Sequence, residues 1–130
     1  MTTVLLDTHV VHWWSAEPDR ISRAAAEALE DADGLAVAAI SWFELAWLAK
    51  HERIVLTIPI RTWLDQLAGH VRTIGVTPAI AETAVSLPSS FPADLADRLI
   101  FATAVENGLR LVTKDRELRS HRHPRPVALW

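Results

Sequence analysis

Four acidic side chains occupy positions at which a metal-dependent reaction would use them. Asp7 directly follows the apolar run TVLL, and Asp115 comes two residues after the run LRLVT. Glu44 and Asp97 lie near the starts of two predicted helices. In an α/β sheet, the carboxyl ends of parallel strands and the N-termini of neighbouring helices gather at one edge. We therefore expect the four carboxylates to converge at that edge.

Each of these acids, taken singly, also has a structural explanation. Acids in the first turn of a helix are favoured by the helix dipole. The run SWFE has the form of a capping box, with Ser41 as the N-cap and Glu44 reaching back to it. The run TKD, which ends at Asp115, has the composition of a turn.

The four acids together indicate divalent metal ions. Four carboxylates at one edge repel one another, and without cations some of them would take up protons. Mg²⁺ or Mn²⁺ relieves this repulsion, because hard ions prefer oxygen ligands and often keep several waters. Two such ions roughly 3.5–4 Å apart are the usual device for hydrolysing a phosphodiester, and no side-chain nucleophile is then needed.

Asp94 and Asp97 stand three residues apart in the stretch FPADLADRLIFATA, at the start of a strongly apolar helix. Asp94 suits the N-cap, where its carboxylate would accept hydrogen bonds from free backbone N–H groups of the first turn. Asp97 would then keep its lone pairs for a ligand. We expect Asp94 to be the cap and Asp97 the metal ligand, with Asp94 contributing at most to the outer shell.

The elements that position these acids alternate along the chain. The continuous apolar runs predict strands over residues 3–7, 35–41, 71–77, 109–113 and 126–130. Helices are predicted over residues 8–14, 22–33, 41–52, 59–70, 77–87, 93–108 and 114–120. Unbroken apolar strands alternating with helices indicate a parallel sheet covered on both faces. We expect one domain over residues 1–130, an α/β fold with three α/β/α layers and a central parallel sheet of four to five strands.

Composition excludes several classes of protein. The absence of cysteine excludes disulfide frameworks and thiolate zinc sites. The N-terminus lacks a basic leader, and no uncharged apolar run reaches the roughly 20 residues of a spanning helix, so we expect a cytoplasmic protein. The net charge of −3 argues against nucleic-acid binding by bulk electrostatics, although residues 110–125 carry six Lys or Arg against two acids. That basic segment is either a phosphate-tracking surface or a solvated tail.

The chain resembles the PIN-domain family, and within it the VapC toxins of bacterial type II toxin–antitoxin systems. The motifs that carry the resemblance are VLLDTHV, ISWFELAWL, DLADRLIFATA and LRLVTKDRELR, in this order along essentially the whole chain. The family run DPADR stands here as DLADR, with Leu95 in place of proline, so no ligand is lost. The resemblance implies a metal-dependent endoribonuclease.

The resemblance also implies roles for individual residues. The four family acids correspond to Asp7, Glu44, Asp97 and Asp115, and Thr113 matches a family hydroxyl beside the last acid. Asp7 and Asp97 are expected to hold the main Mg²⁺ or Mn²⁺ ion. Glu44 and Asp115 would ligate a second ion or orient the attacking water. The candidates for contacts to RNA phosphates are Arg98, Arg116 and Arg119, each of which also fits a solvated helix face or an ion pair.

The expected partners are an RNA substrate, a small VapB-type antitoxin and a second copy of the chain. Trp13 and Trp47 would suit a groove for the antitoxin, whereas His9 and His12 are expected at the surface or at a partner contact rather than as metal ligands. The run HRHPRP is expected to be a connector. Two alternatives stay open: a non-catalytic PIN-like binding module, and a haloacid-dehalogenase-like phosphatase, which normally has a second Asp at the position of His9.

Overall fold

A five-stranded, fully parallel sheet forms the centre of the molecule. In this computed structural model, which describes residues 2–121 and 126–130, the strands lie in the order β3-β2-β1-β4-β5. Their bounds are β1 Thr3–Leu6, β2 Gly34–Ala38, β3 Arg72–Ile74, β4 Arg110–Val112 and β5 Ala128–Leu129. The expected parallel sheet is confirmed, with strands shorter than the apolar runs that predicted them.

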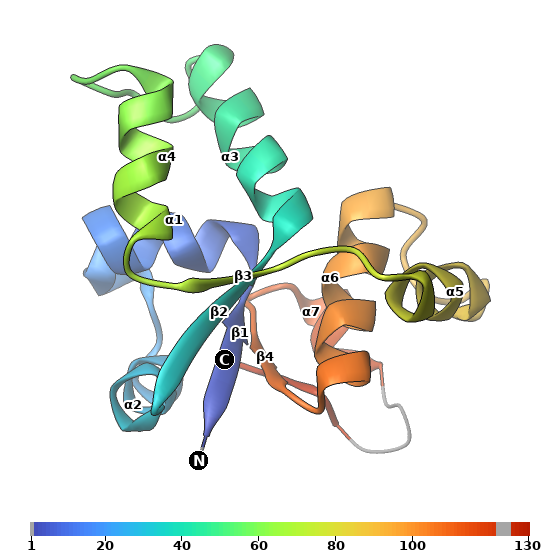
Figure 1. Cartoon of the computed structure of the whole chain (residues 1–130). Coiled ribbons are helices and arrows are strands. Elements are labelled where there is room, and N and C mark those ends of the chain that lie inside the picture. The colour runs from blue at the N-terminus through green and yellow to red at the C-terminus, as the bar shows by residue number, and fades with distance from the viewer. Residues whose placement is uncertain (1, 122–125) are drawn as a thin grey trace.

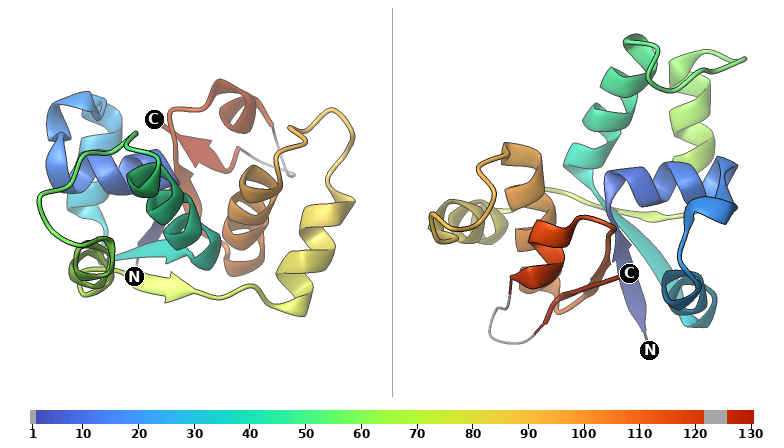
Figure 2. Two further views of the ribbon diagram at one scale, coloured as in Figure 1. Left: turned by 90° about the horizontal axis from the view of Figure 1, so that it is seen from above. Right: turned by 180° about the vertical axis from the view of Figure 1, so that it is seen from behind.

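Helices cover both faces of this sheet (Figures 1 and 2). One face carries α1 (Thr8–Ala16), α2 (Arg23–Asp31), α3 (Ala39–Lys50) and α4 (Ile60–Ala68), with a short 3₁₀ turn at Pro18–Arg20. The other face carries α5 (Pro78–Ser86), α6 (Leu95–Asn107) and α7 (Arg116–Ser120). The expected three-layer α/β/α fold is thus confirmed.

Successive strand residues supply the two cores in turn. Leu5 of β1 packs with the α5–α6–α7 layer, whereas Val4 and Leu6 pack with the opposite layer. This follows from the period of two in a strand, which sends alternate side chains to opposite faces. Because both faces are buried along β1, β2 and β4, most positions of these strands are apolar, and polar residues such as Thr3 and Arg110 stand at their first positions.

The start of α3 differs from the expected capping box. The helix begins at Ala39, and its N-cap Ala38 makes no side-chain capping hydrogen bond. Ser41 therefore lies inside the helix and Glu44 in its second turn, so the prediction of Ser41 as N-cap was wrong. The buried Ser41 hydroxyl instead lies 2.9 Å from the Thr8 hydroxyl of α1, because tertiary contacts override the local capping preference.

Helix α6 begins and ends as the sequence predicts. The Asp94 side chain accepts a hydrogen bond from the Asp97 backbone N–H at 3.0 Å, and Gly108 ends the helix with a φ of 62°. That left-handed conformation is one that glycine adopts without strain. Among the described residues, no helix is long and apolar enough to cross a membrane. Most of the HRHPRP run lies outside the described residues, which omit 122–125.

Candidate active site

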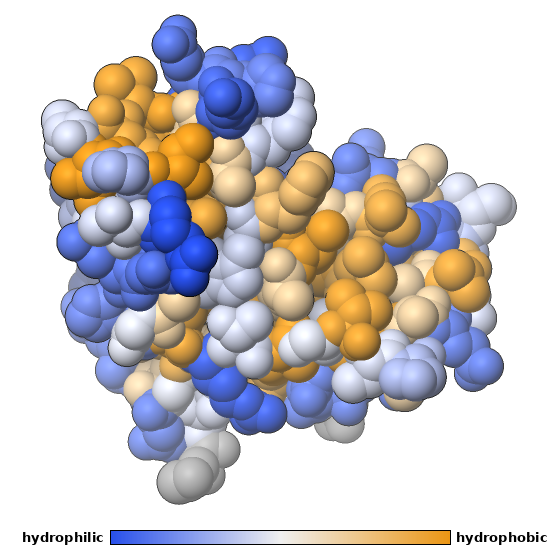
Figure 3. All heavy atoms as spheres, turned by 45° about the horizontal axis from the view of Figure 1, so that its top comes forward, coloured by the Kyte–Doolittle hydropathy of each residue, from blue (hydrophilic) through white to orange (hydrophobic). Residues whose placement is uncertain are grey.

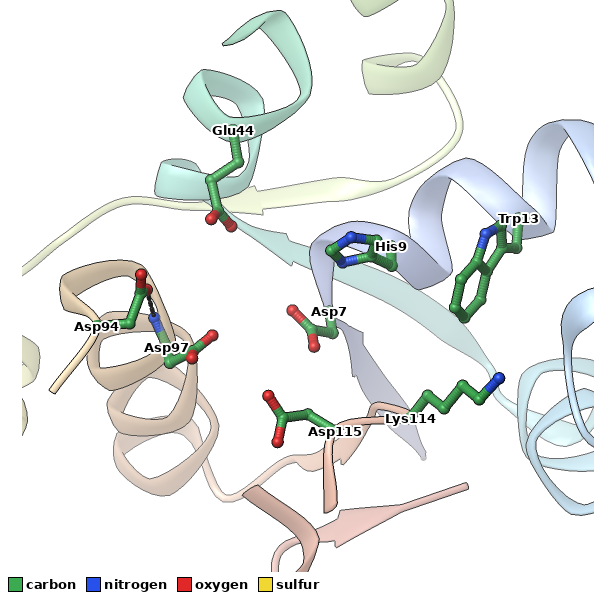
Figure 4. A pocket seen from close by; sticks show the side chains of 8 residues that line it. All are labelled: Asp7, His9, Trp13, Glu44, Asp94, Asp97, Lys114 and Asp115. Atoms are coloured by element: carbon green, nitrogen blue, oxygen red, sulfur yellow. Dashed lines mark hydrogen bonds between the residues drawn. The ribbon is translucent and has the colours of Figure 1, made fainter. Parts of the chain in front are cut away.

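The carboxyl edge of the sheet opens into a cavity of about 560 Å³ that all four predicted acids line. Figure 4 shows Asp7, Asp97 and Asp115 pointing toward a common space, with Glu44 reaching into it from α3. These side chains come from segments far apart in the sequence, since β1, the middle of α3, the first turn of α6 and the N-terminus of α7 meet here. The cavity is lined by Asp7, His9, Trp13, Glu44, Asp94, Asp97, Lys114 and Asp115.

Asp7 is the most buried of the four acids, with 8% of its surface exposed. It caps α1, and its Oδ1 accepts a hydrogen bond from the Thr8 backbone N–H at 2.7 Å. Its Oδ2 accepts one from the Thr113 hydroxyl at 2.6 Å. Each oxygen keeps a lone pair, so the carboxylate is fixed in place and can still bind a cation.

Asp115 is tied to the same hydroxyl. Its backbone N–H donates to Thr113 Oγ1 at 3.1 Å, and its Oδ1 accepts from the backbone N–H groups of Glu117 and Leu118. Thr113 is fully buried and so links the β1 and β4 strand ends. The sequence indicated Thr113 only through the family resemblance, whereas the structure shows which carboxylate it orients.

Glu44 is held by a hydroxyl that the sequence did not single out. The Thr8 hydroxyl donates to Glu44 Oε1 at 2.5 Å and lies 2.9 Å from the Ser41 hydroxyl. Thr8 and Ser41 are both buried. In the sequence, Ser41 was marked only as a predicted N-cap and Thr8 only by its place directly after Asp7, so neither pointed to Glu44 as a tertiary partner. The contact carries Glu44 from the helix surface toward the cavity.

The carboxylates in the cavity destabilise one another in the ionised form. Burial, followed by the charges of Asp94 and Asp7, raises the pKa of Asp97 to about 7. Burial also raises the pKa of Glu44 and that of Asp7, although hydrogen bonds from Thr8 and Thr113 oppose the shift. No ion pair joins any of the four predicted acids to a basic side chain in the described parts of the chain. The cavity therefore attracts a cation.

The donor set fits a hard divalent ion. All of the acids facing the cavity offer carboxylate oxygens, which Mg²⁺ and Mn²⁺ prefer. Among the described residues, no three acidic or histidine side chains already enclose a metal position. An open arrangement of this kind suits an ion that keeps several of its waters, as Mg²⁺ does.

Arg98 is placed differently from the expectation that it contacts RNA phosphate. Its Nε donates to the Pro92 carbonyl at 2.9 Å, and its other four N–H groups face the carbonyls of Ala84, Leu87, Pro88 and Phe91 at 3.1–3.3 Å. A guanidinium group has five N–H donors, and all five are engaged. Arg98 therefore holds the loop before α6 and has no donor free for a phosphate.

The other candidate residues divide between the cavity and the surface. Arg116 and Arg119 lie on α7 outside the set that lines the cavity, so their phosphate contacts stay predictions. His9 is exposed and lines the cavity, whereas His12 Nε2 lies 3.1 Å from Glu17 Oε2. The sequence missed Lys114, which also lines the cavity.

Known proteins match both the sequence and the fold. Residues 4–124 match the PIN domain. The chain belongs to the PIN-domain family. It is 73% identical over 130 residues, the full length of both chains, to a protein of Mycobacterium tuberculosis (strain ATCC 25618 / H37Rv) named Ribonuclease VapC22. The resemblance to VapC proteins is confirmed, and PIN-domain membership replaces the phosphatase alternative.

Solved structures support the PIN fold at lower identity. A toxin–antitoxin complex from Klebsiella pneumoniae is 23% identical with a TM-score of 0.68, covering 98% of this chain and 96% of that one. VapBC2 from Rickettsia felis, bound to a DNA fragment from its promoter, is 16% identical with a TM-score of 0.72 and covers 98% of both chains. At these identities the likeness shows the fold.

Proposed function

We propose that this chain is the ribonuclease toxin of a type II toxin–antitoxin pair. It hydrolyses RNA phosphodiester bonds as an endoribonuclease that depends on Mg²⁺ or Mn²⁺. The observation that carries this proposal is the convergence of four carboxylates in one cavity, in a PIN-domain chain that is 73% identical along its whole length to a ribonuclease. The raised pKa values of three of these acids support a bound cation.

Each acid has a proposed role. Asp7 and Asp97 hold the principal ion, since Asp7 is oriented by Thr113 and the backbone N–H of Asp97 is already capped by Asp94. Glu44 and Asp115 complete the set as ligands of a second ion or as hydrogen-bond acceptors for the attacking water. Mg²⁺ or Mn²⁺ bound here would stabilise charge on the phosphate oxygens and lower the pKa of water.

The proposed partners are the RNA substrate, a VapB-type antitoxin and a second copy of the chain. The antitoxin proposal is supported by structural neighbours that are toxin–antitoxin complexes. The homodimer is supported by exposed apolar side chains beyond those near the cavity, among them Val76 and Val85. We propose the cytoplasm as the location of this activity, since the proposed substrate is cellular RNA.

The deciding experiment compares the wild type with Asp97→Asn on total cellular RNA, with Mg²⁺, with Mn²⁺ and with EDTA. We expect discrete fragments from the wild type that EDTA abolishes. Asp97→Asn should lower the cleavage rate by more than about 100-fold, because even partners outside a metal's ligand set are worth about 10–100-fold. Glu82→Gln on the exposed surface of α5 is the matched control and should cleave normally.

The same experiment separates the proposal from the non-catalytic alternative. A wild type that binds RNA or a partner but cuts nothing in any metal would favour a binding module. Cleavage that persists in EDTA would remove the metal from the mechanism. Cleavage by Asp97→Asn at the wild-type rate would remove Asp97 from the site.

A further inference from the structure

The cavity has two chemically different walls. Asp94, Asp97 and Glu44 lie on one side, and His9, Trp13 and Lys114 lie on the other (Figure 4). Of the Lys and Arg side chains in the described part of the chain, Lys114 alone lines this cavity. The acids repel any polyanion that approaches them. A cation on the opposite wall would offset this repulsion and help to bind the polyanion in the cavity.

The backbone around Lys114 determines where its side chain lies. Thr113 is buried against Asp7, and Asp115 caps α7, so the intervening Lys114 is turned to the exposed side. Its Nζ lies 5.7 Å from the centroid of the Trp13 ring. Figure 4 shows this ammonium group pointing away from the carboxylates, and no ion pair joins it to an acid among the described residues.

Trp13 is a fixed platform for this cation. Only 9% of the residue is exposed, and its ring lies 5.8 Å from that of Trp130 and 5.8 Å from that of His9. The guanidinium carbon of Arg20 lies 5.2 Å from the same ring. Cations are attracted to the face of an indole ring at such distances. The ring therefore holds the Lys114 ammonium group at this end of the cavity, away from an ion pair with the acids.

We propose that Lys114, supported by Trp13, binds a backbone phosphate of single-stranded RNA next to the phosphate that is cleaved. This inference rests on the proposed ribonuclease function and adds a substrate-positioning residue to it. A lysine is a compact point charge that suits a phosphate contact without reading the base. Lys114 therefore contributes to RNA affinity and not to the chemical step.

The test measures RNA binding in the Asp97→Asn background, so that cleavage does not interfere. A short fluorescent single-stranded RNA is titrated with protein in Mg²⁺ over a range of KCl concentrations. Lys114→Met should raise the Kd about five- to tenfold at low salt, and the slope of log K against log salt should become shallower by about 0.7, the value for one phosphate on a single strand.

Two variants serve as controls. Lys50→Met removes the other lysine of the chain, which is exposed at the C-terminal end of α3 outside the cavity, and should leave Kd and slope unchanged. Lys114→Arg keeps the charge and should restore most of the affinity. Circular dichroism of each variant establishes that it is folded.

Kinetics with the otherwise wild-type protein complete the test. Lys114→Met should raise KM for RNA while kcat stays within about twofold, because only uniform binding is lost. A Kd and a salt slope equal to those of the parent, no RNA binding by the parent, or a loss confined to kcat would each overturn the proposal. Failure of the wild type to cleave any RNA, with the Lys114 effect on binding intact, would instead overturn the proposed nuclease.

Discussion

Asp97 is the acid at which the cost of ionising a carboxyl group in this site can be measured directly. Its pKa is raised to about 7, above the ordinary value of 3.8, chiefly by burial and then by neighbouring acids. The folded state therefore binds the proton more tightly than the unfolded state does. In metal-free protein, the resulting destabilisation is fully present above pH 7 and disappears as the pH falls from 7 toward 4.

Asp97→Asn should consequently stabilise the metal-free protein at pH 8 and make its stability less dependent on pH. After allowance for solvent screening of this half-buried group, we expect a gain on the order of 1–2 kcal/mol that vanishes near pH 4. Urea unfolding in EDTA across this pH range measures it, with Glu82→Gln as the control. If the free energy of unfolding depended on pH in the same way in Asp97→Asn and in the wild type, the pKa of Asp97 would not be raised in the folded state.

At the scale of the elements, the sequence predicted correctly those residues whose hydrogen-bond partners are close in the sequence. Asp94 was correctly predicted as the cap of α6, because the hydrogen bond that its side chain accepts comes from the N–H group three residues away in the sequence. Ser41 was wrongly predicted as a cap, because its hydroxyl has a partner in α1 that local spacing does not reveal. Arg98 was predicted to contact phosphate for the same reason, since local spacing does not reveal its five carbonyl acceptors at the end of α5 and in the loop before α6.

Arg98 should be a main source of stability for the segment between α5 and α6. It holds five carbonyls of residues 84–92, and Figure 1 shows this segment connecting α5 to the N-terminus of α6. Arg98→Met should lower the free energy of unfolding by about 2–4 kcal/mol, because hydrogen bonds to a charged group are strong and the carbonyls lose their donors. Urea unfolding of the purified protein measures the loss.

The stabilisation by Arg98 should depend on the number and geometry of its N–H donors and not only on its charge. Arg98→Lys keeps the positive charge with fewer donors and should recover no more than about half of the lost stability. Arg61→Met is the matched control, because Arg61 forms an exposed pair with Asp65 on α4 and should cost less than about 0.5 kcal/mol. Full stability of Arg98→Lys would contradict the argument.

At the scale of the whole molecule, the layered fold could be predicted because both faces of the sheet are buried. The continuous apolar runs and the helices between them follow from that burial. The strand order β3-β2-β1-β4-β5 depends on pairings between distant segments, and nothing in the local pattern indicates it. The local pattern also did not indicate which apolar side chains stay on the surface: Figure 3 shows several groups of apolar residues among polar ones on the face that it draws.

Exposed apolar side chains of α3 adjoin the acidic cavity and are our candidate for the antitoxin contact. A second cavity of about 260 Å³ is lined by Phe43, Trp47 and Leu48 of α3, and it shares His9 and Glu44 with the first cavity. Phe43 is 66% exposed and Trp47 is 43% exposed. Large aromatic side chains left open to solvent beside a site are typical anchors of a protein interface. Trp13, by contrast, is buried and unsuited to this role.

Trp47→Ala should therefore weaken antitoxin binding and leave RNA cleavage by the free protein unchanged. We expect a loss of about 2 kcal/mol, or roughly 30-fold in Kd, because a central aromatic anchor loses its contact area. Calorimetry with a VapB-type antitoxin that binds the wild type measures it, and Val55→Ala, at a side chain that is 86% exposed, is the apolar control. An unchanged Kd in Trp47→Ala would remove α3 from the antitoxin interface. A parallel loss of cleavage would indicate that the aromatic wall binds RNA, so that antitoxin and substrate compete for one surface.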